Sequence, residues 1–362
     1  MTTAYLDWTQ IARHFASQAK ACARDNASPT SAAILDGCAS ALSSDHPLRT
    51  IIAAAERHDA DAAVSLRVLG ALHRLALDGT APDLAAIMPS AGGNADPGHA
   101  WAIADQVIRR HGDFIRAYLA NAPQTNEVGR SAMLLGGFLE IARATQKPFR
   151  LLEIGSSAGL NLFWDRYRVV NEVFNWGPAD SPVVLRTSWQ GEAPHLDAPV
   201  EVIERSGCDM APLDIRNPDD VRRMESYVWT DQLDRFNRMR AAVGIATTTP
   251  FTLDRADAAG WIEHKVMQSV PGVATVVLHS IMWQYMPAAT QSRIAEAITD
   301  AGARATDDAP LAWLAMEPKD IRSFPEVTLT LWPGGERRVL GTAHFHGAWM
   351  KWGGSTGDQI TS

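Results

Sequence analysis

The stretch that decides the fold is RLLEIGSSAGLNL, residues 150–162. An apolar run ends at the acid Glu153, and Gly155 and Gly159 then stand among small residues before a helical pattern begins. Because glycine permits backbone conformations and close approaches that side chains block, these residues predict a strand that turns tightly into a helix. Free N–H groups at the start of that helix would make the turn a cradle for an anionic group. A tight turn that binds nothing is the alternative interpretation.

The chain before this stretch has a helical pattern. Segments rich in alanine and leucine carry apolar residues three or four positions apart, as at Leu66, Leu69, Leu72 and Leu75. Segments rich in proline and glycine separate them, as in MPSAGGNADPGHA. We therefore expect residues 1–147 to form an N-terminal helical lid domain.

The chain after residue 147 alternates between short β-rich runs and helical patterns. This alternation predicts a parallel sheet built from right-handed crossovers. The expected strands are residues 149–154, 200–208, 251–255, 275–280, 311–317, 327–332 and 337–345. The expected helices between the first five strands are residues 158–169, 218–243, 258–268 and 288–301. We interpret residues 171–199 as an insertion that contains a hairpin.

The last two strands depart from this alternation. The connection PKDIRSFPE, residues 318–326, is too short for a crossover helix, and WPGGE makes a tight turn into the next strand. These features predict an antiparallel meander at one edge of a mostly parallel α/β sheet. We expect this domain to span residues 148–352 and residues 353–362 to form a disordered tail.

The composition limits the classes of partner. The chain has 362 residues, of which 46% are hydrophobic and 20% charged, with a net charge of −8. It has no run of basic residues, which argues against nonspecific binding to nucleic acid or to an anionic membrane. Neither a signal peptide nor a transmembrane stretch is expected, and the three cysteines form no metal or disulfide pattern. We expect a cytoplasmic protein with a small-molecule substrate.

The segment LLEIGSSAG resembles the first motif of class I methyltransferases that use S-adenosylmethionine (SAM). That motif has an apolar strand, an acid and G-x-G-x-G, with the middle glycine often replaced, and here Ser157 occupies the middle position. The spacing does not match the dinucleotide pattern G-x-G-x-x-G, and the lysine of a phosphate-binding loop is absent. The resemblance implies a Rossmann-like methyltransferase sheet with SAM as cofactor. The residues it implies for SAM binding in this motif are Glu153, Gly155, Ser157, Gly159 and Asn161.

Two acids at the ends of later strands extend the resemblance. Asp209 follows the second strand, where a carboxylate can accept hydrogen bonds from both ribose hydroxyls. Asp257 follows the third strand and resembles the acid that contacts adenine in the same family. Each could instead cap the N-terminus of a helix. Glu204 is a second candidate for the ribose.

The methyl acceptor is expected where the strand order reverses, between the first and fourth strands of a 3-2-1-4-5 sheet. His279, at the end of the fourth strand, is the candidate general base. Trp283 and Tyr285 are candidates to line the acceptor pocket and to pack against the sulfonium. A hydrogen-bonded core histidine with two packing aromatics is the alternative.

His344 and His346 are expected on one face of the last strand, near Glu317 at the end of the fifth. They could bind or deprotonate the acceptor, could be structural, or could form a His-His-carboxylate metal site, although we assign no metal. In TNEVGR, Asn126 and Arg130 could reach over the cradle, or the segment could cap the helix that follows.

The chain as a whole resembles an uncharacterised bacterial family that is known only as a domain of unknown function. The resemblance covers most of residues 50–352 and rests on QTNEVGR, LLEIGSSAGLNLFWDRY, ERSGCDMAPLD, VLHSIMWQYM and HFHGAWMKW. We expect SAM-dependent methyl transfer to a small molecule. A non-catalytic ligand sensor or scaffold and a SAM-using enzyme that does not methylate are the alternatives. The acceptor and the oligomeric state stay open.

Overall fold

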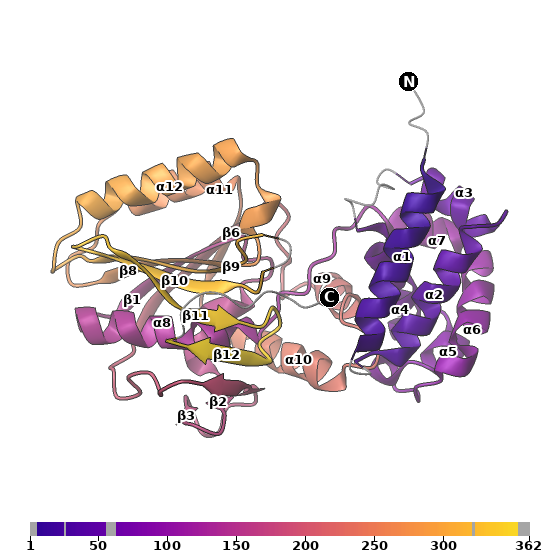
Figure 1. The fold of residues 1–362 in the computed structure, drawn as a ribbon, viewed down its shortest axis with the longest axis horizontal. Coiled ribbons are helices and arrows are strands. Elements are labelled where there is room, and N and C mark those ends of the chain that lie inside the picture. The colour runs from indigo at the N-terminus through magenta and orange to yellow at the C-terminus, as the bar shows by residue number, and fades with distance from the viewer. Residues whose placement is uncertain (1–5, 25–26, 56–62, 321–322, 354–362) are drawn as a thin grey trace. The chain divides into compact units, whose positions relative to one another are not determined.

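The structure is a computed structural model that describes residues 6–24, 27–55, 63–320 and 323–353 (Figure 1). The chain divides into two compact units. Residues 1–125 and 216–237 form the helical unit, and residues 126–215 and 238–362 form the α/β unit. The boundary predicted at residue 147 lies inside the α/β unit. Apart from Gly353, the predicted tail lies outside the described residues.

The helical unit contains the expected N-terminal helices. Several begin at a proline, whose fixed φ and missing N–H suit the first helical position. Its elements are α1 (Trp8–Ala23), α2 (Pro29–Ala41), α3 (Pro47–Ala53), α4 (Val64–Leu77), α5 (Pro82–Ala85), η3 (Pro89–Ala91), α6 (Pro97–Arg110), α7 (Gly112–Tyr118), α9 (Pro218–Ser226) and the start of α10 (Leu233–Thr247).

The segment 216–237 is part of the core of the helical unit. Tyr227 belongs to the same buried cluster as the residues of α1, α2 and α4. His73 of α4 lies 3.0 Å from the carbonyl oxygen of Ser226 and 2.7 Å from the hydroxyl of Ser90. Burial lowers the pKa of His73 to about 4, so this histidine is an uncharged structural residue near neutral pH.

The α/β unit contains a nine-stranded sheet with the order β5-β12-β11-β10-β9-β8-β1-β6-β7. The neighbours from β7 to β9 pair in parallel, and β10, β11 and β12 continue as an antiparallel meander. The predicted 3-2-1-4-5 order and edge meander are therefore confirmed. The strands of this sheet are β1 (Phe149–Ile154), β5 (Ser188–Gln190), β6 (Val202–Asp209), β7 (Thr252–Arg255), β8 (Ala274–Ser280), β9 (Leu311–Glu317), β10 (Glu326–Trp332), β11 (Arg337–Ala343) and β12 (Trp349–Trp352).

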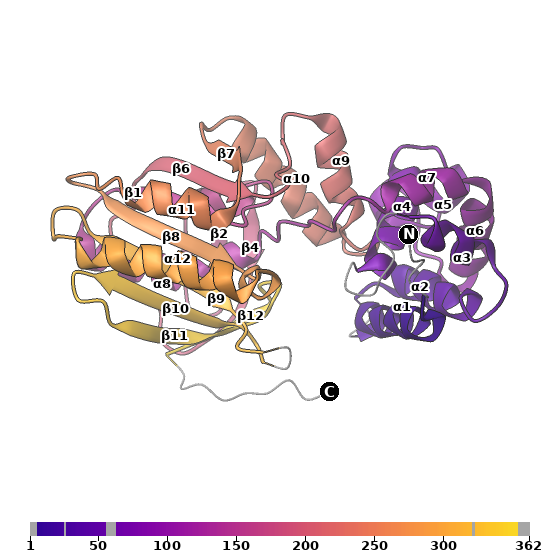
Figure 2. The ribbon, with the colours of Figure 1, turned by 90° about the horizontal axis from the view of Figure 1, so that it is seen from above.

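Helices cover both faces of this sheet. Helix α8 (Arg130–Thr145) lies on one face, and α11 (Ala258–Val266) and α12 (Ala288–Ala303) lie on the other (Figures 1 and 2). On the α8 side, the rings of Phe138 and Trp164 stack with centroids 4.0 Å apart. Such a pair contributes about 0.5–1.5 kcal/mol beyond the burial of its apolar area. Both faces are thus closed, as a parallel sheet requires.

Two predicted helices are wrong. Residues 158–169 do not form one helix, because a 3₁₀ helix, η4 (Leu160–Arg166), is followed by strand β2 (Arg168–Val170). Residues 218–243 form two helices, α9 and α10. The segment between them holds Asp231, whose carboxylate accepts hydrogen bonds from the N–H and the hydroxyl of Thr30 at the start of α2.

The predicted hairpin is present in part, because β2 and the next strand, β3 (Asn175–Trp176), pair antiparallel across residues 171–174, with β2 lying just before the predicted insertion. The insertion also forms strands that were not predicted. It contributes to a small three-stranded sheet in which β2 lies between β3 and β4 (Val184–Arg186). Strand β5 also belongs to this insertion, and it pairs in parallel with β12 at the edge of the large sheet. Neither β5 nor β12 was predicted. Within the described ranges, every helix is too short or too polar to cross a lipid bilayer.

Candidate functional site

Most of the predicted site residues lie along the edge of the large sheet that is formed by the carboxyl ends of its parallel strands. Strands β1, β6, β7, β8 and β9 are parallel, so their carboxyl ends meet at this edge. After β1 the chain builds β6 and β7 on one side, and β8 and β9 then lie on the other side. The strand order therefore reverses between β1 and β8, where open α/β sheets bind their ligands.

The glycine turn follows β1 at this edge. Gly155, Ser157 and Gly159 all have positive φ, at 65°, 55° and 75°. A Cβ atom added to Gly155 would lie 2.8 Å from the Cε atom of Met282, so the Met282 side chain lies directly over the turn. The positive φ values and this close approach explain the two glycines.

Two buried polar atoms at this turn have no hydrogen-bond partner among the described residues. They are Oε2 of Glu153 and Oγ of Ser157. Burial raises the pKa of Glu153 to about 8, the nearby Asp209 adds to this, and Arg130 opposes it. A buried polar atom without a partner costs about 1–3 kcal/mol. A polar ligand that bonded to these two atoms would remove this cost, so the turn is a candidate ligand site.

Asp209 ends β6 beside the turn. Its Oδ2 atom accepts a 3.0 Å hydrogen bond from the Ser157 N–H, and its Oδ1 atom accepts a 2.9 Å bond from the Ala211 N–H. Asp209 therefore connects the glycine turn to the end of β6. The rival Glu204 lies near the start of β1 and pairs with Arg150 at 3.2 Å, so the structure places it away from this edge.

Two further residues implied for SAM binding have structural partners. Asp257 is exposed and caps the N-terminus of α11, because its Oδ2 atom accepts a 3.0 Å hydrogen bond from the Gly260 N–H. The Oδ1 atom of Asn161 accepts a 2.7 Å bond from the Ser131 hydroxyl of α8. The N-cap that the sequence allowed for Asp257 is therefore present.

The TNEVGR segment lies against the glycine turn. Asn126 caps η4, since its Oδ1 atom accepts a 2.8 Å hydrogen bond from the Leu160 N–H. At the start of α8 the N-cap position is Gly129, and Glu127 of the same segment accepts a 3.0 Å hydrogen bond from the Gly129 N–H through its Oε1 atom. Arg130 donates to the carbonyl oxygen of Ser280 at 3.0 Å and to that of Phe345 at 3.2 Å. The segment thus connects the turn to the ends of β8 and β11.

His279 is buried at the end of β8, and both of its ring nitrogens are engaged. The Trp313 indole N–H donates to Nε2 at 3.0 Å, and Nδ1 lies 2.8 Å from Oε1 of Glu317. An indole N–H can only donate, so Nε2 is an acceptor and Nδ1 carries the proton that is donated to Glu317. Trp283 stacks on the His279 ring with centroids 4.9 Å apart, whereas Tyr285 is 76% exposed.

The prediction that His344 and His346 share one face of the last strand is wrong. Strand β11 ends at Ala343, and His344 and His346 lie in the turn that follows it. His346 lies 3.7 Å from the buried carboxylate of Glu127, while Glu317 bonds to His279. The rings of His344 and His346 lie 5.7 Å apart, and the His346 N–H donates to Nδ1 of His344 at 3.1 Å, so the two histidines are neighbours while the bond of Glu317 goes to a different histidine. In the part of the chain that the structure describes, no group of three His, Cys, Asp or Glu side chains could hold a metal ion.

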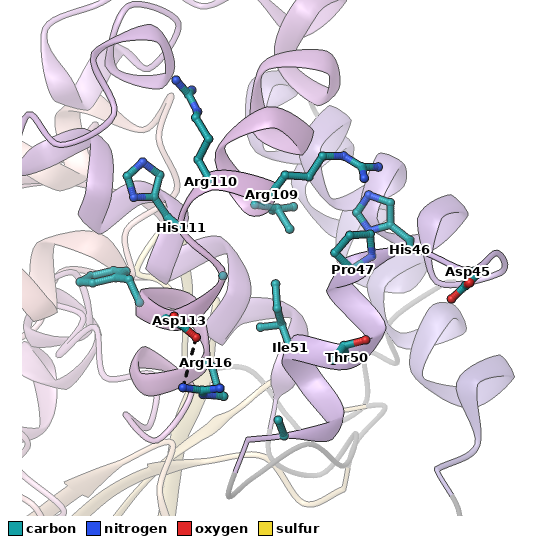
Figure 3. Close-up of a pocket in the computed structure, with 14 residues that line it drawn as sticks. Asp45, His46, Pro47, Thr50, Ile51, Arg109, Arg110, His111, Asp113 and Arg116 are labelled. Atoms are coloured by element: carbon teal, nitrogen blue, oxygen red, sulfur yellow. Dashed lines mark ion pairs between the residues drawn. The ribbon is translucent and has the colours of Figure 1, made fainter.

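The helical unit has a cavity of its own, of about 740 Å³ (Figure 3). Arginines line it, but they have carboxylate partners: Arg109 pairs with Asp105 at 3.1 Å and Arg116 pairs with Asp113 at 3.2 Å. Because these pairs balance the charge, the cavity does not favour an anion.

Sequence reasoning missed part of the site. The polar residues Glu326, Thr328 and Thr330 of β10 line a cavity beside His279, together with Trp313 of β9. The pattern EVTLTLW alternates polar and apolar residues through the strand, and this period of two indicates one polar face.

Comparisons with known proteins place the chain in a family. A family model described as "Uncharacterized protein conserved in bacteria (DUF2332)" matches residues 12–352. The chain belongs to this family. No curated protein and no solved structure matches it.

Proposed function

We propose that this family member binds SAM at the glycine turn and transfers its methyl group to a small-molecule acceptor. The observation that carries the proposal is the pair of unpartnered buried atoms, Glu153 Oε2 and Ser157 Oγ, at a turn where the strand order reverses. The methionine part of SAM carries an ammonium and a carboxylate, which are natural partners for such atoms. The Met282 thioether over Gly155 is flexible and can rotate away.

Three acids would divide the work of binding. Glu153 would bind the ammonium group. Asp209 would accept hydrogen bonds from the ribose hydroxyls, and since a carboxylate offers about four acceptor sites, its bonds to the turn are compatible with that role. Asp257, exposed after β7, would approach the adenine while it caps α11.

SAM supplies an electrophilic methyl group on a cationic sulfur. The protein then has to orient the acceptor and exclude water. Both nitrogens of His279 are engaged, so we assign the role of base to the Glu317 carboxylate, which His279 orients through its Nδ1–H. Glu317 also accepts the Met282 N–H at 3.2 Å, which fixes the segment over the glycine turn.

The alternative function is a ligand sensor that binds SAM without turnover. The engagement of both His279 nitrogens favours it, because the histidine offers no open basic atom.

Isothermal titration of the whole chain with S-adenosylhomocysteine tests the proposal, with NAD as control. We expect micromolar or tighter binding of the first alone. Asp209→Asn should weaken binding by about tenfold to a hundredfold, because a charged acceptor is lost. Glu204→Gln, on the same strand but at its other end, should leave binding unchanged. The absence of binding would overturn the proposal, and binding without methyl transfer would favour the sensor.

A further inference from the structure

A cavity of about 290 Å³ lies on the face of β9, β10 and β11. We call it the β9–β11 groove. Its floor consists of directly paired residues of the antiparallel strands β9 and β10, which alternate so that every second residue faces the groove. The pairs are Trp313 with Thr330, Ala315 with Thr328, and Glu317 with Glu326.

The floor of the groove is polar although it is buried. Glu326, Thr328 and Thr330 are only 5%, 8% and 6% exposed. Neither threonine hydroxyl makes a hydrogen bond to any described residue, and both residues line the groove. A sheet face that served only as core would be apolar. These hydroxyls are therefore available to a ligand in the groove.

Two carboxylates stand side by side at one end of the groove. Glu317 and Glu326 are directly opposite each other on adjacent antiparallel strands, where like charges destabilise a sheet. Glu317 is bonded to His279, and Glu326 is paired with Lys319 at 2.7 Å. Lys319 is 58% exposed, so its ammonium reaches the buried carboxylate from the solvent side. Arg337 of β11 also lines the groove, but it pairs with Thr330 at the opposite end, so the end that holds the two carboxylates attracts a cation.

Two indole rings line the groove, that of Trp313 on the floor and that of Trp283. The rings of Trp283 and Trp313 lie 5.8 Å apart at an angle of 51°. Indole faces attract cations and bury apolar groups. Paired carboxylates beside two indoles form a site that suits an ammonium attached to an apolar body.

We propose that the β9–β11 groove binds a small organic amine. The ammonium lies at Glu317 and Glu326 in place of the Lys319 ammonium, and the apolar body packs against Trp283 and Trp313. The threonine hydroxyls bind polar substituents. The volume is enough for one small molecule.

That this amine is the methyl acceptor rests on the proposed function. Met282 connects the two sites, because its N–H is bonded to Glu317 and its side chain lies over Gly155. In that reaction the ammonium first loses a proton to the Glu317 carboxylate. The neutral nitrogen then forms the N–C bond as the S–C bond breaks, and S-adenosylhomocysteine leaves.

The binding test uses the whole chain and 2-phenylethylamine as probe. Matched probes of the same shape are 2-phenylethanol, which is neutral, and 3-phenylpropionate, which is anionic. Calorimetry should show that the amine binds at least about tenfold more tightly than either of these. Equal binding of the three probes, or no amine binding up to about 10 mM, would overturn the proposal.

Two variants should shift amine binding in opposite directions. Glu326→Gln removes one carboxylate and should weaken binding by about tenfold. Lys319→Met removes the competing ammonium and should tighten binding several-fold, and it tests the site even if Glu326→Gln fails to fold. Binding that is unchanged or weaker in Lys319→Met contradicts the assignment. Asp209→Asn should weaken S-adenosylhomocysteine alone, so that failure of the groove and failure of the SAM site are distinguishable.

Discussion

Glu153 has an unusual protonation state for an acid near neutral pH. Its carboxyl is buried at the glycine turn, one oxygen has no hydrogen-bond partner, and burial raises its pKa to about 8. Below that pH the free protein therefore holds this side chain mostly as the neutral acid. Binding of an ammonium group requires the ionised form, so ligand binding is linked to release of a proton.

The affinity for S-adenosylhomocysteine should therefore rise with pH. Between about pH 5.5 and 7.5 the ionised fraction of Glu153 grows tenfold per pH unit, and the dissociation constant should fall by about the same factor. Glu153→Gln should bind more weakly and lose this dependence. Calorimetry across this range measures both. A wild-type profile as flat as that of the variant would contradict the role of Glu153.

The same residue should affect stability in a defined direction. Because the folded-state pKa lies above the unfolded value of about 4.3, the contribution of Glu153 is complete below that value and is lost as the pH rises through about 8. Urea unfolding at pH 6 and pH 9 should show the wild type losing free energy of unfolding relative to Glu153→Gln. An equal change in both proteins would count against a buried, protonated Glu153.

At the scale of elements, the 3₁₀ helix η4 shows how one distant residue can end a helical pattern. The guanidinium of Arg205, buried on β6, donates to the carbonyl oxygen of Leu162 and makes two 2.7 Å bonds to the carboxylate of Asp165. Leu162 thus gives its oxygen to a side chain, where a regular helix would bond it to the N–H of Arg166. The bonds between Arg205 and Asp165 therefore fix η4 in place after β1.

Arg205→Lys should destabilise the α/β unit by about 2–4 kcal/mol, because lysine cannot make the bidentate bond and leaves a buried acceptor without a partner. Arg166→Lys is the matched control, because Arg166 is 54% exposed and its Nε atom lies 3.5 Å from Oδ2 of Asp165, farther than the 2.7 Å bonds of Arg205. Its cost should be within about 0.5 kcal/mol. Chemical denaturation measures both. Similar losses in the two variants would show that the Arg205 bonds do not hold η4.

For the whole molecule, the features predicted from sequence are those encoded locally. The continuous apolar run of β8 and the alternation of strands and helices were sufficient for the parallel order, and the short connections were sufficient for the meander. The features that were missed depend on contacts between distant residues. Arg205 on β6 bonds to Asp165 and interrupts the helix that the sequence pattern predicted there. Strand β12 pairs with β5, as Lys351 with Gln190, across more than a hundred residues of chain. His279 and Asn161 were identified from the sequence, but their partners Trp313 and Ser131 were not, because hydrogen bonds between distant residues leave no periodic pattern in the sequence.

The helical unit should depend on its second segment. His73, the buried Tyr227 and the Asp231 carboxylate connect residues 216–237 to the first 125 residues. A fragment of residues 1–125 alone should therefore unfold at low urea concentration, or fail to fold. The same fragment joined to residues 216–237 by a short flexible linker should unfold cooperatively. Circular dichroism during urea titration compares them. Equal stability of the two fragments would show that residues 216–237 do not stabilise the helical unit.

This division of the helical unit has a consequence for the order of events during protein synthesis. Residue 125 leaves the ribosome well before residue 237, and at bacterial elongation rates of about 5–20 residues per second the interval is roughly 5–20 s. During that time the nascent helices lack Tyr227 and the Asp231 bonds to α2, and they present an incompletely covered apolar surface. Chaperones that recognise exposed apolar segments would therefore bind mainly in this interval, before residues 216–237 of the helical unit have been synthesised.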